Sequence, residues 1–201
     1  MRAMMVRYGP RRDRPHRNEP AMTWHLSRRR FIGGSVAAVC VGCGADSGTV
    51  MGGRVVAGTV DEVQAAIAES GAMYVAAASA YVASVPADLV DAAVAAHDPA
   101  LHAGFRAGFV ALRQTCTHLG CRVQPCASSG WFECPCHAGH FDQLGDYRDG
   151  LAERGLDLLP VTVEAGDVVI DSDTLITGRP KGSAPIDPRD ADGPHCFEFG
   201  T

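Results

Sequence analysis

Two short runs of cysteine and histidine carry the chemistry that this sequence can support. Cys116 and His118 form a Cys-x-His pair, and Cys134 and His137 form a Cys-x-x-His pair. Each pair offers one thiolate and one imidazole. The fifteen residues between His118 and Cys134 leave room for a strand, a turn and a returning strand that brings two loop tips together. The four residues are therefore candidate ligands of one metal centre.

Two kinds of centre fit this donor set. Zinc would take all four ligands tetrahedrally and would stabilise a small domain without redox chemistry. A [2Fe–2S] cluster with mixed ligation would place both cysteines on one iron and both histidines on the other, and would carry electrons. The iron and zinc content of the purified protein distinguishes the two.

The run CTHLGC at residues 116–121 and the run CPCH at residues 134–137 resemble the two cluster-binding loops of Rieske iron–sulfur proteins. The similarity extends over residues 110–161. An additional cysteine in each loop resembles the branch found in the iron–sulfur subunit of cytochrome bc complexes (quinol–cytochrome c reductases). The resemblance implies that these cysteines, Cys121 and Cys136, form a disulfide. It also implies an all-β fold of stacked antiparallel sheets, with a cluster-binding subdomain and short helical insertions.

The same resemblance assigns the ligands of one [2Fe–2S] cluster. Cys116 and Cys134 would hold the buried iron, whereas His118 and His137 would hold the outer iron. Leu119, between a ligand and the next cysteine, would help to form an apolar docking surface. No residue is expected to act as a catalyst, because the role implied is electron transfer within an oxidoreductase.

The sequence departs from the family pattern directly after the second ligand pair. The family usually continues Gly-Ser-x-Tyr, whereas this chain has Ala138-Gly139-His140-Phe141. The serine hydroxyl and the tyrosine phenol are therefore missing, and such hydrogen bonds stabilise the reduced cluster and raise its potential. The loop Gly150–Glu153 also lacks the usual prolines. These departures predict a low potential, suited to menaquinol or another low-potential donor, and His140 is expected to be exposed to solvent.

The N-terminal region resembles a twin-arginine export signal. Ser27–Ile32 reads SRRRFI, and an apolar run of small residues follows to about Ala45. Such signals carry folded, cofactor-loaded proteins out of the cytoplasm. Translation could begin at Met1 or at Met22. Cys43 is a candidate lipidation site, so a retained anchor, a lipid anchor and full release are all alternatives for a protein of the bacterial cell envelope, at the outer face of the cytoplasmic membrane.

The charge distribution argues against nucleic acid as a partner. Nine of the 18 basic residues lie within residues 1–30, which hold only two acidic ones. From Phe31 onward nine basic and 21 acidic residues leave a formal charge of −12. An acidic exported domain repels nucleic acid and suits a basic cytochrome partner.

Composition divides the chain into four parts. They are a disordered N-terminus with the signal or anchor (1–45), a linker with a short helix (46–72), the iron–sulfur domain (73–180) and a mobile C-terminal tail (181–201). Thr59 and Glu62 match a capping box, which predicts a helix that ends at Gly71.

Several further elements are predicted from periodicity. Residues 73–85 favour one strand, and residues 86–97 favour a surface helix inserted between strands. The remaining expected strands are 108–113, 131–133, a hairpin of 161–163 with 168–170, and 174–177. Cys126 and Cys196 are either free or joined as a disulfide from the tail to the loop, and Trp131 and Tyr147 are expected to pack.

Three functions remain in competition. The first is the iron–sulfur subunit of a quinol-oxidising bc-type complex, working with a membrane cytochrome b and passing electrons to a c-type cytochrome. The second is a stand-alone or small-subunit electron carrier for another exported oxidoreductase, as in the small subunit of arsenite oxidase. The third is a zinc-stabilised module without redox activity.

Overall fold

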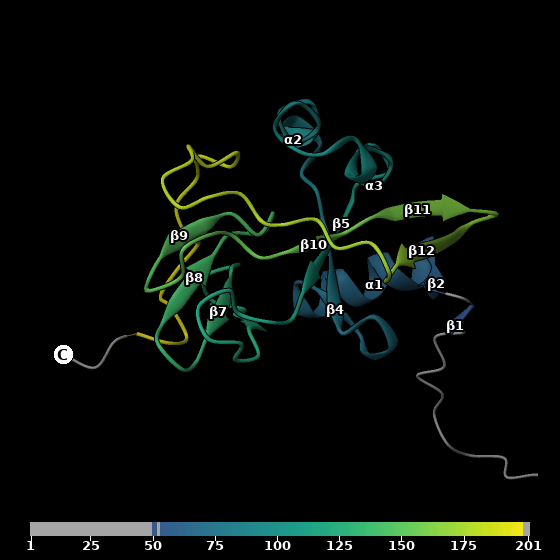
Figure 1. Cartoon of the computed structure of the whole chain (residues 1–201). Coiled ribbons are helices and arrows are strands. Elements are labelled where there is room, and N and C mark those ends of the chain that lie inside the picture. Colours follow the sequence, from purple (N-terminus) through teal and green to yellow (C-terminus); the bar gives the residue numbers. More distant parts are fainter. Residues whose placement is uncertain (1–49, 52, 199–201) are drawn as a thin grey trace, which may run out of the picture. The chain divides into compact units, whose positions relative to one another are not determined.

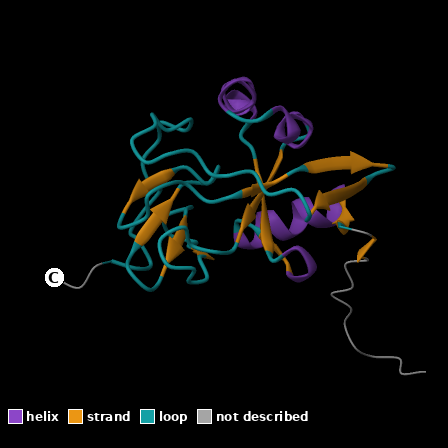
Figure 2. Ribbon diagram, in the orientation of Figure 1, coloured by secondary structure: helices purple, strands orange, loops and turns teal. Residues whose placement is uncertain are grey.

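The computed structural model describes residues 50–51 and 53–198. The predicted export signal, Met22 and Cys43 lie outside these residues. The described part is mostly β, with short helices and three four-stranded antiparallel sheets (Figures 1 and 2). This architecture confirms the predicted fold class. Within the described residues, no helix has both the length and the apolar character that a membrane crossing requires.

Each sheet has a simple strand order. The first sheet contains β1 (Val50–Met51), β2 (Arg54–Thr59), β12 (Asp167–Asp171) and β11 (Val161–Glu164), in that order. The second sheet contains β10 (Leu158–Leu159), β5 (Phe109–Arg113), β4 (Ala80–Ser84) and β3 (Met73–Val75). The third sheet contains β6 (Gln124–Pro125), β7 (Phe132–Cys134), β8 (Gly139–Phe141) and β9 (Tyr147–Asp149). The predicted hairpin is confirmed as β11 and β12.

Helix α1 (Val60–Ser70) follows β2 directly and has the predicted ends. The Thr59 side chain accepts a hydrogen bond from the Glu62 backbone N–H, and the Glu62 carboxylate accepts one from the Thr59 backbone N–H. Gly71 ends the helix with φ of 79°, a conformation that glycine adopts without steric cost. The capping-box prediction is therefore confirmed.

The single strand predicted over residues 73–85 is wrong. The structure has two strands there, β3 and β4, joined by a turn of 3-10 helix at Ala76–Ala78. Ser79 closes this turn with φ of 49°. The turn contains no glycine, proline, asparagine or aspartate, and one serine alone is a weak turn signal. Alanine and valine continue through it as they would through one buried strand.

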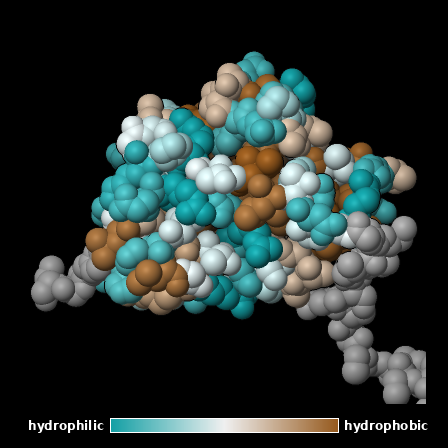
Figure 3. Space-filling model, viewed as in Figure 1, coloured by the Kyte–Doolittle hydropathy of each residue, from teal (hydrophilic) through white to brown (hydrophobic). Residues whose placement is uncertain are grey.

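The surface helix predicted over residues 86–97, between β4 and β5, is confirmed as α2 (Val90–Ala96). The insertion also contains α3 (His102–Arg106), which was not predicted, and each helix is preceded by a turn of 3-10 helix. Leu89, Ala93, Leu101 and Phe105 are buried on this insertion. In the view of Figure 3 most of the surface is hydrophilic, and an apolar area lies below these helices. The insertion thus caps one edge of the core without contributing a strand.

Two groups of buried side chains form the core. One group, which includes Val55, Val82 and Ile170, lies between the first and second sheets. The other joins the second sheet to the third and includes Leu112, Cys116, Phe132, Cys134 and Phe141. Both candidate cysteine ligands therefore belong to the core that fixes the third sheet in place.

The last predicted strand is not formed. Within residues 174–177 only Ile176 pairs, in an isolated bridge with Leu158 of β10. Their two backbone hydrogen bonds, 2.8 and 2.9 Å, fasten this segment to the edge of the second sheet. Thr177 is followed by Gly178, at which a Cβ atom would lie 2.3 Å from the Gly155 carbonyl oxygen. The close approach leaves no room for a side chain at residue 178.

Candidate metal centre

The first loop tip follows β5 and holds Cys116 and His118. Its base is a bridge between Thr115 and Arg122. The Cys116 N–H donates to the Cys121 carbonyl oxygen at 2.7 Å, and the Gly120 N–H donates to the Cys116 carbonyl oxygen at 3.0 Å. Gly120 has φ of 81°, which lets the tip turn back within these few residues. The tip is therefore fixed by its own backbone.

The second loop tip joins β7 to β8 and holds Cys134 and His137. Cys134 pairs with Gly139 at the end of the two strands, so the intervening residues form the tip. Ala138 has φ of 43°, in the left-handed region. A non-glycine residue there costs about 1–2 kcal/mol, and the family pattern has glycine at this position. The third sheet holds the strained tip in place.

The two cysteine ligands predicted from the sequence are buried and unpaired. Cys116 is 3% exposed and Cys134 is 2% exposed, and both are free thiols. The pKa of the Cys116 thiol is raised to about 11, because burial and the neighbouring Cys134 thiol outweigh the backbone N–H groups of His118 and Leu119, which lower it. A metal ion releases such protons when it binds, because it takes the thiolate as its ligand.

The two imidazoles are more exposed than this thiol pair and lie close to each other. His118 and His137 are both partly exposed, and their ring centroids are 4.9 Å apart at an interplanar angle of 78°. The two loops thus carry two buried sulfur donors and two partly exposed nitrogen donors. This donor set fits a centre with one buried and one outward-facing metal ion.

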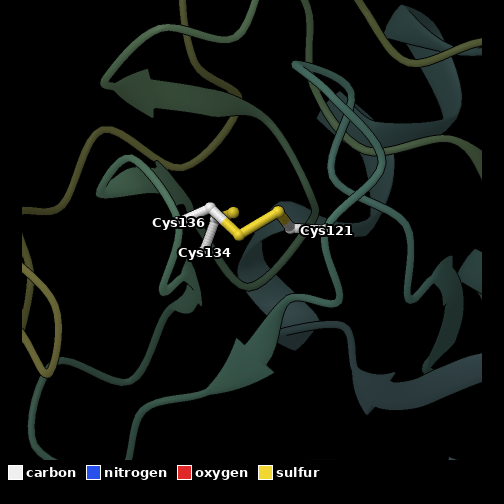
Figure 4. A group of neighbouring side chains, drawn as sticks. All are labelled: Cys121, Cys134 and Cys136. Atoms are coloured by element: carbon white, nitrogen blue, oxygen red, sulfur yellow. A yellow bond between two sulfur atoms is a disulfide. The ribbon is translucent and has the colours of Figure 1, made fainter. Parts of the chain in front are cut away.

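A disulfide joins the two loop tips. Cys121 and Cys136 are bonded, with their Cα atoms 6.5 Å apart, so the predicted disulfide is present. Figure 4 shows it bridging the two segments with Cys134 close beside it. The Cys134 sulfur lies within 4.8 Å of both bonded sulfurs.

The family comparison agrees with this geometry. The family model described as "Rieske [2Fe-2S] domain" matches residues 72–160, somewhat less than half of the chain. Residues 72–160 are a Rieske [2Fe–2S] domain. Its cofactor is one [2Fe–2S] cluster, and its general role is electron transfer.

Known proteins resemble this Rieske domain over short stretches. The carotenoid phi-ring synthase of Chlorobaculum tepidum is 43% identical over 72 residues, which is 36% of this chain and 11% of that protein. The ubiquinol-cytochrome c reductase iron-sulfur subunit of Rhodobacter capsulatus is 45% identical over 58 residues, 27% of this chain and 29% of that protein. The chain therefore matches less than a third of the length of these two relatives.

A solved structure shows a more extensive but weaker likeness. The soluble domain of the Rieske protein II from Sulfolobus acidocaldarius is 17% identical and covers 69% of this chain and 84% of that one, with a TM-score of 0.44.

A third segment of the Rieske domain covers both loop tips. The Thr117 hydroxyl donates to the Arg154 carbonyl oxygen at 2.8 Å. A Cβ atom at Gly150 would lie 2.6 Å from the Ala138 carbonyl oxygen, so only glycine allows this approach. The Tyr147 hydroxyl donates to the Gly150 carbonyl oxygen at 2.7 Å. These contacts position the covering segment although it lacks the prolines that the resemblance led us to expect.

The positions of the missing hydroxyl groups lie beside Cys134, a candidate ligand. A Cβ atom at Gly139 would be 3.6 Å from the Cβ of Cys134 and 3.7 Å from the Cζ of Phe141. Phe141 is wholly buried in the same core as Cys134. A serine at 139 would therefore fit without a clash, and its hydroxyl would lie near the Cys134 side chain.

The prediction of a solvent-exposed His140 is wrong. This residue is 5% exposed, its Nε2 hydrogen-bonds the Phe197 carbonyl oxygen at 2.7 Å, and its ring stacks on His195 at 3.9 Å. The C-terminal segment covers it, because the disulfide between Cys126 and Cys196 is formed. No local sequence pattern around His140 indicates this contact.

Glu133 is a functional candidate that the sequence reasoning missed. It precedes the candidate ligand Cys134 and is fully buried. Burial raises the pKa of its carboxyl group, but hydrogen bonds from Ser129, His195, Phe197 and Cys196 outweigh this effect, and the pKa is lowered. The signal available in the sequence was a charged residue within the apolar run Trp131–Cys134, which is costly to bury unless it is paired.

Proposed function

We propose that Cys116 and Cys134 hold the inner iron of the cluster and that His118 and His137 hold the outer iron. The observation that supports this assignment is the pair of buried thiols beside two partly exposed imidazoles, in loops tied by the Cys121–Cys136 disulfide. Once bound, the cluster accepts and releases one electron. The chain keeps water from the sulfur side and presents the imidazole edges to a partner.

The surface around the imidazoles suits contact with another protein. Leu119 in the first loop is 71% exposed, and Leu151 in the covering segment is 48% exposed. Exposed leucines beside a redox centre provide apolar contact area at the point where the electron leaves or enters. We take these residues as the docking surface of the domain.

The partners proposed first are those of a quinol-oxidising bc-type complex. In this role the domain accepts an electron from a low-potential quinol bound at a membrane cytochrome b and passes it to a c-type cytochrome. The similarity to the Rhodobacter capsulatus subunit supports this proposal over the matched residues. The acidic composition from Phe31 onward would attract a basic cytochrome.

A second function follows from the altered residues near the cluster. A stand-alone or small-subunit carrier for another exported oxidoreductase needs no high-potential quinol chemistry. The absent hydroxyl groups at Gly139 and Phe141 favour this alternative. In either role we propose export by the twin-arginine signal and a tether, by a signal anchor or through Cys43, at the outer face of the cytoplasmic membrane.

Identification of the partner tests both functions. Solubilised membranes from the native host, passed over affinity-tagged protein, are expected to yield a cytochrome b with quinol:cytochrome c reductase activity. Recovery of a different exported oxidoreductase, without cytochrome b, would support the second function and end the first. The tag belongs at the C-terminus, because the N-terminal signal must stay intact.

A lowered potential is expected for the cluster. One hydrogen bond to a charged acceptor is worth about 1.5–3 kcal/mol, and a one-electron couple moves about 59 mV per tenfold change in its equilibrium constant. After allowance for water in the vacant places, loss of both hydrogen bonds should lower the potential by about 100 mV. Rieske centres span roughly −150 to +300 mV, so we expect a midpoint in the lower half of this range.

Restoring the hydroxyl groups should reverse the shift. The double change Gly139→Ser with Phe141→Tyr is expected to raise the midpoint, measured by EPR-monitored titration. Gly139→Ala is the matched control for the first position, because it adds the same Cβ atom without a hydroxyl, and it should leave the midpoint nearly unchanged. A wild-type midpoint above about +250 mV, near the top of the known range, would contradict both the lowered potential and the menaquinol assignment.

A further inference from the structure

A buried carboxylate lies directly behind one proposed cluster ligand. Glu133 and Cys134 are successive residues of β7, and successive side chains of a strand point to opposite faces of the sheet. Cys134 faces the core together with Phe132 and Phe141. Glu133 faces the other side, directly opposite His140 of β8. Since Glu133 has no exposed surface, something must cover that side.

The cover is the C-terminal segment Gly193–Phe197, which we call the latch. It supplies three of the four hydrogen-bond donors to Glu133. His195 Nδ1 lies 2.8 Å from Oε1, and the backbone N–H groups of Cys196 and Phe197 donate to Oε2 at 2.7 and 2.9 Å. The Ser129 hydroxyl donates to Oε1 at 2.6 Å. Two backbone donors on one oxygen are the environment of an ionised carboxylate.

The latch has little apolar packing of its own. None of residues 188–198 is buried. Further contacts hold the segment. The Ser128 hydroxyl donates to the Pro194 carbonyl oxygen at 2.7 Å, and the Asp192 N–H, just before the latch, donates to the Ser129 carbonyl oxygen at 3.0 Å. His140 bonds the Phe197 carbonyl oxygen and stacks on the His195 ring. A disulfide then joins exposed Cys196 to buried Cys126, 70 residues earlier in the chain. This covalent bond is the strongest restraint that keeps the latch on Glu133.

We propose that the latch keeps Glu133 ionised and shielded from water behind Cys134. The buried negative charge then lowers the reduction potential of the cluster. A fixed negative charge opposes the arrival of an electron, and it does so more strongly where water is excluded. Opening the latch admits water, which screens the carboxylate and also stabilises the reduced cluster. Both effects raise the potential. The inference rests on the proposed role of Cys134 as a ligand.

Glu133→Gln removes the charge and keeps the shape. The glutamine carbonyl oxygen can accept from the two backbone N–H groups, and its amide can donate to the Ser129 hydroxyl and to His195 Nδ1. We expect the equilibrium constant for one-electron reduction to rise about tenfold, which is about 59 mV. Glu69→Gln removes the same charge from an exposed site on α1, and this change should alter the equilibrium constant for reduction less than twofold. Equal shifts in the two variants would overturn the proposal.

The double variant Cys126→Ser with Cys196→Ser tests the latch without altering the charge of Glu133. We expect the backbone N–H groups of Cys196 and Phe197 to lose their protection from hydrogen exchange, and the potential to rise in the same direction as in Glu133→Gln. If both amides keep wild-type protection, the disulfide is not what holds the latch, and the proposal fails.

The result for the wild-type protein separates this proposal from the proposed function. Reduced wild-type protein without the EPR spectrum of a cluster with mixed nitrogen and sulfur ligation would defeat the ligand assignment, and the latch proposal with it. If the wild type gives that spectrum but Glu133→Gln does not shift the potential, the latch proposal alone is defeated. If the potential rises in Glu133→Gln and in the double cysteine variant, and the spectrum is retained, the ligand assignment and the latch proposal are both supported.

Discussion

Replacement of His118 or His137 by alanine is expected to remove essentially all of the cluster iron. Each imidazole supplies one of the two protein ligands of the proposed outer iron, and alanine leaves that iron with a single nitrogen donor. Because all four candidate ligands would hold one cluster, loss of one of them should cost the cluster as a unit. Iron content per chain and the EPR spectrum of the reduced protein measure this result.

His140→Ala is the matched control for these substitutions. It lies three residues after His137, but its Nε2 bonds the Phe197 carbonyl oxygen, and we expect the full iron content to be retained. Loss of only part of the iron in His118→Ala or His137→Ala would contradict the ligand assignment. So would a wild-type spectrum whose average g value matches that of an all-cysteine ferredoxin.

Removal of the Cys121–Cys136 disulfide should leave a cluster that assembles but is labile. The bond ties together two loop tips that carry one ligand to each iron, and it closes a separation of 15 residues. Cross-links of this length restrain the unfolded chain by about 3 kcal/mol in the chain-entropy description. In Cys121→Ser the tips can separate, so we expect faster loss of the visible absorbance on warming and a shifted potential.

The second disulfide provides the comparison for this result. In Cys126→Ser with Cys196→Ser the loop tips remain joined, and the cluster should decay at nearly the wild-type rate. Equal decay rates in the two disulfide variants would show that the bridge between the tips has no special protective role. Mass spectrometry that finds Cys121 and Cys136 as free thiols in exported, oxidised protein would remove the basis of the prediction altogether.

The sequence predicted those parts of the fold that local rules determine. The Thr59–Glu62 capping box and the Gly71 stop set α1, and the β11–β12 hairpin turns at Ala165 and Gly166. The turn between β3 and β4 was missed because Ser79 adopts the left-handed conformation in an alanine-rich run without glycine, proline, asparagine or aspartate. An apolar run indicates that a segment is buried, but it does not indicate where the chain reverses.

The sequence nominated the candidate ligands but did not indicate the contacts that support them. Spacing nominated four residues, of which the structure buries Cys116 and Cys134 in one core and places the His118 and His137 rings 4.9 Å apart. The contact of Thr117 with Arg154 and the cover over Glu133 and His140 are tertiary contacts between distant segments. The first depends on the path of the covering segment and the second on how the C-terminal segment crosses the third sheet, and no local periodicity carries that information.

The two disulfides make the order of cluster insertion and disulfide formation important. The described residues contain six cysteines, Cys116, Cys121, Cys126, Cys134, Cys136 and Cys196. Six free thiols can be fully paired in 15 ways, whereas four can be paired in only three. In the proposed assignment, iron that binds Cys116 and Cys134 first acts as a protecting group and withdraws these two thiols from oxidation. Cofactor insertion before export would thus spare the protein most of its wrong cross-links.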